Sequence, residues 1–342
     1  MQKMIKHKSF YIIIISLILS LYLSISLGDA NININKNILS WLGFNYEIEA
    51  ISKFIFQEIR IPRALMALII GAILATSGTV MQAIFRNPLA DPGLIGVSSG
   101  GAVGAILFIT IFSSLELGNF KWVLDSGMII FPMLGAILTT FLVFKLSQYN
   151  KKTNVATMLL TGLAINAIAG TIIGYATFLS TDDQLRSFTF WSLGTLGRSN
   201  WSLIQILFPI FLFVIICKLM LRKELNLLLL GEYEAHYLGV NVEATRRNLI
   251  ILTSGIVGLS VSLCGMIGFL GLVTPHICRL IFGPNHKILL PMSALIGGII
   301  LINADLLSRV LIPYSELPIG IVTSFIGAPF FLYLIVKSKK TI

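Results

Sequence analysis

Long apolar segments recur along the whole chain, and short polar segments separate them. Most of them approach the roughly 20 residues that a helix needs to cross a bilayer. The pattern predicts ten membrane-spanning helices, at residues 10–27, 64–83, 94–112, 127–146, 155–179, 203–221, 249–264, 268–282, 288–304 and 319–336. We therefore expect an all-α polytopic membrane protein.

Residues 249–282 can be interpreted as two helices or as one. Residues 249–282 are too many for one straight crossing, and Gly265, Gly268 and Gly271 mark a break between two helices. An undivided segment would give nine helices and place the C-terminus on the other side. We expect one permease domain over residues 1–342, whose long polar segments are an outer loop at 29–60 and an inner loop at 222–247.

Composition supports the membrane assignment. Apolar residues make up 56% of the chain and charged residues 12%, with a mean hydropathy of +0.90. This balance excludes most soluble and all disordered classes. The net charge of +10 does not predict a nucleic-acid partner, because the basic residues form short clusters between apolar segments and no basic domain.

The distribution of charge predicts the orientation. With ten helices, most of the 25 Lys and Arg residues, Lys218 among them, fall in the segments on the side of the termini. The positive-inside rule then places both termini in the cytoplasm and the chain in the cell membrane. Residues 10–27 follow Lys3, Lys6 and Lys8 and could be a signal peptide, but their length favours a retained helix.

Several kinds of chemistry are missing from the sequence. It has no GxxxxGKS or GxxxxGKT motif for a nucleotide and no HExxH motif for zinc, and its four histidines are scattered. We expect no catalytic residues, no metal site and no cofactor in this chain. Ionisable residues are scarce within the spans, so an ion-coupled secondary transporter is the less favoured alternative. An intramembrane enzyme would need a paired nucleophile and base that the sequence does not provide.

Two groups of residues are candidates for function. Gly162, Asn166, Gly170 and Gly174 recur every four residues and share one helix face, which could either pack closely against another helix or line a pathway.

The second group is basic and lies outside. In the sequence Arg60-Ile61-Pro62-Arg63, the proline is expected to start the second helix and leave both arginines near the outer membrane surface. They could anchor the helix there or bind an acidic partner. Arg309 follows Asp305 by four residues, where an ion pair within one helix is the simplest explanation.

Four segments resemble one known family, the permeases of ABC importers for iron chelates, haem and vitamin B12. The resemblance covers almost the whole chain and is carried by residues 60–105 (RIPRALMALIIGAILATSGTVMQAIFRNPLADPGLIGVSSGGAVGA), 231–240 (GEYEAHYLGV), 265–291 (GMIGFLGLVTPHICRLIFGPNHKILLP) and 305–335 (DLLSRV followed by ELPIGIVTSFIGAPFFLYLI). It implies a vitamin B12 permease-like fold and a subunit that moves a metal chelate into the cytoplasm, with an iron–siderophore as the first expectation and haem or cobalamin next.

The resemblance also implies partners. These are a second permease subunit in a homodimer or heterodimer, two cytoplasmic ATPase subunits that bind ATP, and an extracytoplasmic substrate-binding protein. On this basis Arg60, Arg63 and Arg309 would dock the binding protein. The helix with Gly162, Asn166, Gly170 and Gly174 would line the translocation pathway. The ATPase would contact a coupling segment that includes Gly231, Glu232, Ala235, Leu238, Gly239 and Val240.

Overall fold

The computed structural model describes residues 2–28, 30, 32–44, 48–112, 121–150, 152–312 and 314–339. Lys151 and Lys340, two of the basic residues that support the predicted orientation, lie outside this part. The α-helices are α1 Gln2–Ser26, α2 Ile34–Trp41, α3 Ala50–Phe54, α4 Ile61–Ile84, α5 Val97–Leu107, α6 Lys121–Leu146, α7 Val155–Leu179, α8 Asp182–Ser192, α9 Trp201–Met220, α10 Arg222–Leu228, α11 Glu232–Tyr237, α12 Val242–Cys264, α13 Leu270–Phe282, α14 His286–Val310 and α15 Ile319–Lys339.

Shorter elements connect these helices. The turns η1 Ile55–Arg60 and η3 Phe108–Phe112 are π-helical, and η2 Pro92–Ile95 is a 3-10 turn. Strands β1 Gln148–Tyr149 and β2 Lys152–Thr153 form an antiparallel hairpin between α6 and α7.

The described helices agree with the expected all-α class. Seven of them are long and apolar enough to cross a membrane, and three shorter apolar helices lie at Val97–Ile111, Leu270–Phe282 and Ile319–Tyr333. The count of ten crossings stays a prediction. The predicted break in residues 249–282 is confirmed, because α12 ends at Cys264 and α13 begins at Leu270. Gly265 stands at the break with a φ of 71°, a backbone conformation that glycine adopts without strain.

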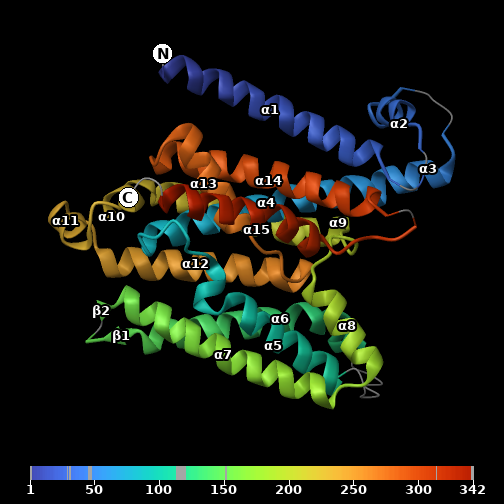
Figure 1. Cartoon of the computed structure of the whole chain (residues 1–342). Coiled ribbons are helices and arrows are strands. Elements are labelled where there is room, and N and C mark those ends of the chain that lie inside the picture. Colours follow the sequence, from blue (N-terminus) through green and yellow to red (C-terminus); the bar gives the residue numbers. More distant parts are fainter. Residues whose placement is uncertain are drawn as a thin grey trace.

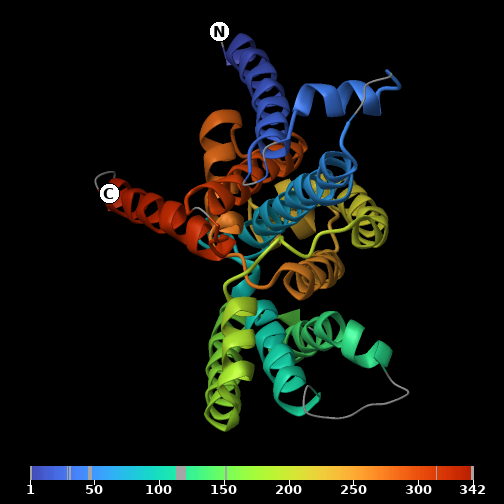
Figure 2. The same cartoon turned by 90° about the vertical axis from the view of Figure 1, so that its right-hand side faces the viewer.

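The helices gather in two groups with α12 between them (Figures 1 and 2). One group contains α5, α6, α7 and α8, and the other contains α1, α4, α9, α13, α14 and α15. Helix α12 packs against α6 of the first group and against α4 of the second. At the centre of the second group, Gly71 and Gly78 of α4 face the backbones of Gly297 in α14 and Gly271 in α13, so these helices approach closely.

Both marked termini lie toward the end of the molecule that carries α10, α11 and the β-hairpin (Figure 1). We call this the α11 end. The opposite end carries α2, α3 and α8, and we call it the α8 end. A chain whose two termini lie at the same end of a helical bundle crosses it an even number of times.

The outer loop at 29–60 is more helical than expected. Its described part contains α2, α3 and η1, whereas residues 29, 31 and 45–47 lie outside the described part. Pro62 lies in the first turn of α4, as expected, but helical backbone already runs from Ala50 through η1 into α4. The π-helical turn before Pro62 explains how the helix accommodates it. The carbonyl of Gln57, five residues before Pro62, accepts a hydrogen bond from the indole N–H of Trp201 at 3.0 Å instead.

Candidate functional site

The glycine-bearing face of α7 divides into a packed half and an open half. A Cβ atom on the buried Gly162 would collide with the carbonyl of Leu94 in η2. The amide of Asn166 donates to the carbonyl of Gly93 at 3.3 Å, and its oxygen accepts from the hydroxyl of Ser99 at 2.6 Å. These two residues therefore fix α7 against η2 and α5.

The other half of this face has no neighbour among the described residues. No atom lies within 4 Å of a Cβ atom built on Gly170 or Gly174, and both glycines are exposed. Large apolar side chains on α7 are exposed as well, among them Leu160, Leu163, Ile168, Tyr175 and Phe178. Helix α7 thus presents an apolar face notched by two glycines, and its role in a pathway stays a prediction.

The three arginines that resemble docking residues lie at the α8 end, and their side chains are buried. Arg63 donates from Nε to Oδ1 of Asp305 at 2.9 Å, and its two Nη atoms donate to Glu316 at 2.7 and 3.0 Å. Arg309 donates from Nε to Oδ2 of the same Asp305 at 3.1 Å. The expected pair between Asp305 and Arg309 is confirmed. Asp305 of α14 therefore binds one arginine of α4 and one of its own helix.

Arg60 binds backbone rather than acids. Its guanidinium donates to the carbonyls of Ile25, Ser26 and Ala30 at 2.6–2.8 Å, at and just beyond the end of α1. The expectation that these arginines can bind an acidic group is met for Arg63 by Asp305 and Glu316 of the same chain. Within one chain, Arg60 and Arg63 hold α1, α4 and α14 together. Docking of a binding protein at these arginines stays a prediction.

Glu316 is part of this cluster and was not anticipated. It lies between α14 and α15, and its side chain remains half-exposed. Burial opposes ionisation of the carboxyl group, but the hydrogen bonds and charge of Arg63 outweigh it, so the pKa of Glu316 is below its usual value. Spacing along the chain carries no signal for this pair, because the two residues are 253 positions apart.

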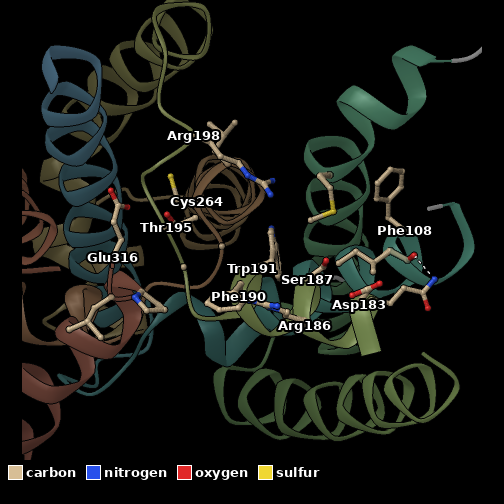
Figure 3. A pocket seen from close by; sticks show the side chains of 18 residues that line it. Phe108, Asp183, Arg186, Ser187, Phe190, Trp191, Thr195, Arg198, Cys264 and Glu316 are labelled. Atoms are coloured by element: carbon tan, nitrogen blue, oxygen red, sulfur yellow. Dashed lines mark hydrogen bonds between the residues drawn. The ribbon is translucent and has the colours of Figure 1, made fainter. Parts of the chain in front are cut away.

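A cavity of about 640 Å³ adjoins the cluster at the α8 end (Figure 3). Glu316 and Arg198 border it on one side and the residues of α8 on the other, and Phe190 and Trp191 contribute an aromatic wall. The cavity therefore lies between the two helix groups, with both apolar and charged walls.

At the α11 end, the residues of the expected coupling segment have different structural roles. Ala235 and Val240 are buried with Leu228 in a small apolar cluster that is separate from the main core. Gly231 and Gly239 flank α11 with φ angles of 141° and 87°, which other residues adopt only with strain. These four residues shape the segment and offer little side-chain surface to a partner.

The exposed residues of the segment are mainly aromatic. Tyr233 is 83% exposed and Tyr237 is 91% exposed, one helical turn apart, and Leu238 beside them is 60% exposed. Of the six residues expected to contact the ATPase, only Leu238 displays a large apolar side chain. The tyrosines were missed, although their spacing of four in a short helix could have indicated a shared face.

Glu232 points inward from the coupling segment. Its Oε1 accepts a hydrogen bond from Nη2 of Arg246 at 2.6 Å, and Arg86 lies at 3.7 Å. Arg246 is 1% exposed. Glu232 therefore belongs to a contact between α11 and α12 rather than to the outer surface of the segment.

Lys218 differs from its expected place in a polar inner segment. It lies within α9 and is fully buried, and its Nζ donates to the hydroxyls of Thr76 and Ser77 of α4 at 3.3 and 2.9 Å. A long alkyl chain allows lysine to enter the bundle from the end of a helix. Lys218 thus joins α9 to α4.

Comparison with known proteins identifies the family. The sequence model of the FecCD transport family matches residues 16–337 of this chain. The chain belongs to this family. It is 39% identical over 330 residues to the hemin transport system permease protein HmuU of Yersinia pestis, covering 96% of each chain. It is also 40% identical over 284 residues to the cobalamin import system permease protein BtuC of Halobacterium salinarum, covering 83% of this chain and 74% of that relative.

A solved structure supports the same conclusion. A metal-chelate type ABC transporter in an inward-facing conformation matches this fold with a TM-score of 0.81 at 32% identity, over 96% of this chain and 99% of that chain. FecCD members are permease subunits of ABC importers, which are not themselves enzymes. The chain is therefore a membrane permease of this type.

Proposed function

We propose that this chain is the translocation subunit of an ATP-driven importer that carries a metal chelate through the cell membrane into the cytoplasm. The observation that carries the proposal is the similarity to the hemin permease over 96% of both chains. Because the sequence lacks a nucleotide-binding GxxxxGKS or GxxxxGKT motif, ATP is assigned to two separate ATPase subunits. No cofactor is assigned to the permease itself.

The pathway is proposed to lie between two permease subunits, either identical or different. The open face of α7 supports this placement, since Gly170 and Gly174 leave the helix backbone uncovered beside exposed apolar side chains. A face of this kind lets a bulky chelate pass close to the helix backbone. Gly162 and Asn166 are assigned to holding α7 in place beside the path.

The α11 end is proposed to be cytoplasmic and to contact the ATPase. Exposed aromatic side chains are favoured at protein interfaces, and Tyr233 and Tyr237 extend from α11 beside Leu238. Both chain termini lie toward this end, which agrees with ten crossings and cytoplasmic termini.

The orientation can be tested by labelling. In a variant without Cys217, Cys264 and Cys278, Asp183→Cys at the α8 end should react in intact cells with a thiol reagent that does not cross membranes. Tyr237→Cys at the α11 end should react only after the cells are opened. The reverse pattern would refute the orientation.

The α8 end is proposed to receive the extracytoplasmic binding protein. Asp305 is fully buried and holds Nε of Arg63, whereas the half-exposed Glu316 holds its two Nη atoms. An incoming carboxylate could therefore reach the outer part of Arg63 by replacing Glu316. Arg309, which shares Asp305, would keep this arginine in position, and Arg60 would hold the end of α1 at the same place.

Uptake in a deletion strain tests the function and the cargo together. Labelled iron–siderophore, haem and cobalamin should be offered separately to cells with and without the permease. We expect one of these chelates to enter only when the permease and its ATPase are both present. An iron–siderophore is our first expectation, and the similarity to a hemin permease supports haem as the second. Equal uptake without ATPase would contradict the proposal and favour ion-coupled transport.

A further inference from the structure

Arg246 of α12 binds three partners with one buried guanidinium. Its Nη1 donates to the carbonyl of Thr153 at 2.8 Å and to Oε1 of Glu243 at 2.9 Å. Its Nη2 donates to Oε1 of Glu232 at 2.6 Å. A planar guanidinium can hold acceptors on different sides in one fixed geometry, which a lysine ammonium cannot reproduce.

Two of these partners belong to segments with different proposed roles, the ATPase contact at α11 and the pathway helix α7. Glu232 is the first residue of α11. Thr153 is the last residue of the β-hairpin, and the next residue, Asn154, caps α7 by accepting a hydrogen bond from the N–H of Thr157 at 3.1 Å. Arg246 therefore connects the first residue of α11 to Thr153, the residue directly before the N-cap of α7.

Helix α11 has little other connection to the main core. Its buried residue Ala235 packs with Leu228 and Val240 in a cluster of its own. Because Thr153 is bound through its backbone carbonyl, the contact acts directly on the chain that leads into α7. A displacement of α11 relative to α12 would therefore shift the guanidinium of Arg246 and, with it, the backbone at the start of α7.

We propose that Glu232 and Arg246 form the link that transmits movement of α11 to α7. The proposal rests on the proposed function, in which α11 contacts the ATPase and α7 lines the path. Arg246 is a positioning residue, since it touches neither nucleotide nor cargo. Arg86, whose Nη2 lies 3.7 Å from Glu232, adds a weaker connection to the turn after α4.

Glu243 provides a matched control. It binds the same guanidinium at 2.9 Å, but it lies on α12 itself, three residues before Arg246. Removing its charge therefore disturbs the same buried group without separating α11 from α12. A purely structural role of Arg246 predicts similar effects of Glu232→Gln and Glu243→Gln, whereas a transmitting role predicts different ones.

The test uses the complete importer, with ATPase and binding protein, in proteoliposomes that report cargo uptake and ATP hydrolysis together. In Glu232→Gln, uptake per ATP hydrolysed should fall about fivefold or more, a typical size for the loss of one residue that couples two sites. Glu243→Gln should keep this ratio close to that of the unaltered protein. Both variants should retain the ATPase, because Tyr233, Tyr237 and Leu238 are unchanged.

Arg246→Lys is the second variant. It keeps the positive charge but cannot span Thr153 and Glu232 together, so its uptake per ATP should fall as in Glu232→Gln while the melting temperature stays close to normal. Equal ratios in Glu232→Gln and Glu243→Gln would overturn the link. So would loss of the ATPase from both Glu232→Gln and Arg246→Lys, since the pair would then only support the docking surface. Failure of the unaltered permease to bind any ATPase would refute the proposed function instead.

Discussion

Helices α4 and α7 have similar composition and opposite surroundings. Their spans have mean hydropathies of 2.1 and 1.8, and both helices contain several glycines. In the most apolar stretch of the span that contains α4, 89% of the residues are buried. In the corresponding stretch of α7, only 17% are buried. Hydropathy therefore predicts that a helix enters the membrane but does not indicate whether its faces meet protein, lipid or a pathway.

The glycines account for part of this difference. Those of α4 meet the backbones of α13 and α14, so α4 is surrounded on several sides by helices at close range. In the described part of the chain, no atom lies within 4 Å of a Cβ atom built on Gly170 or Gly174 of α7. The same residue type thus permits close packing in one helix and leaves the backbone uncovered in the other.

The largest expected effect separates these two uses of glycine. Gly78→Leu should destabilise the protein by more than about 3 kcal/mol, since the new side chain would collide with the backbone of Gly271 rather than with a flexible side chain. Gly174→Leu should change stability by only about 0.5 kcal/mol or less, as exposed sites usually do. Yield of monodisperse protein in detergent and its melting temperature measure both; equal losses would contradict the comparison.

Transport gives the second prediction. Gly174→Leu places a bulky side chain on the open face of α7, so chelate uptake should fall to the background of the deletion strain although the protein folds and reaches the membrane. Gly255→Leu serves as a control, because nothing lies within 4 Å of a Cβ atom there either, yet it is on α12. Normal uptake by Gly174→Leu would indicate that this face meets lipid.

The third prediction extends the comparison to α11, whose exposed residues are proposed to meet a partner outside the membrane. Tyr233→Ala with Tyr237→Ala should lower the amount of ATPase that copurifies with the permease by about tenfold, in keeping with the loss of two aromatic contacts at an interface. The stability of the permease should hardly change because both side chains are exposed. Replacement of the exposed Tyr149 in the β-hairpin by Ala is the control, and equal losses from both variants would argue against a specific docking surface.

The smallest expected effect concerns the ion pair that α4 makes with Glu316. The pKa of Glu316 is lower in the folded protein than in the unfolded chain, so the pair stabilises the fold at pH values above the unfolded pKa. This contribution is lost as the pH falls through the folded pKa. Because Glu316 is half-exposed, we expect about 1 kcal/mol or less. The difference in melting temperature between the protein and Glu316→Gln should be present at neutral pH and shrink in acid; a constant difference would show that the ion pair does not cause it.

Local sequence features predicted local structure well. The apolar segments coincide with helices, the break near Gly265 follows from three glycines, and the pair between Asp305 and Arg309 follows from a spacing of four on one helix. The place of Pro62 in the first turn of α4 was predicted as well, but the helical turns before it were not; a π-helical turn and the indole of Trp201 satisfy the backbone there.

Contacts between distant segments could not be predicted from spacing. Arg63 and Glu316 meet only after α4 and α14 have packed, and Arg246 meets Thr153 only after the hairpin has folded over α12. The candidate coupling residues were found by resemblance, but their division into buried, strained and exposed positions depends on how α11 folds back on α10. Burial of Arg60 against the end of α1 likewise depends on tertiary packing.

The most direct measurement of the central claim is the accessibility of the open face of α7 in the working importer. Gly170→Cys and Gly174→Cys, in a variant without the native cysteines, should react with a water-soluble thiol reagent at rates that change when ATP is added. Ile15→Cys on the exposed face of α1 is the lipid-facing control and should stay unreactive in every state. If both α7 cysteines were as unreactive as the α1 control with and without ATP, the face would be buried in lipid and the proposed pathway would be wrong.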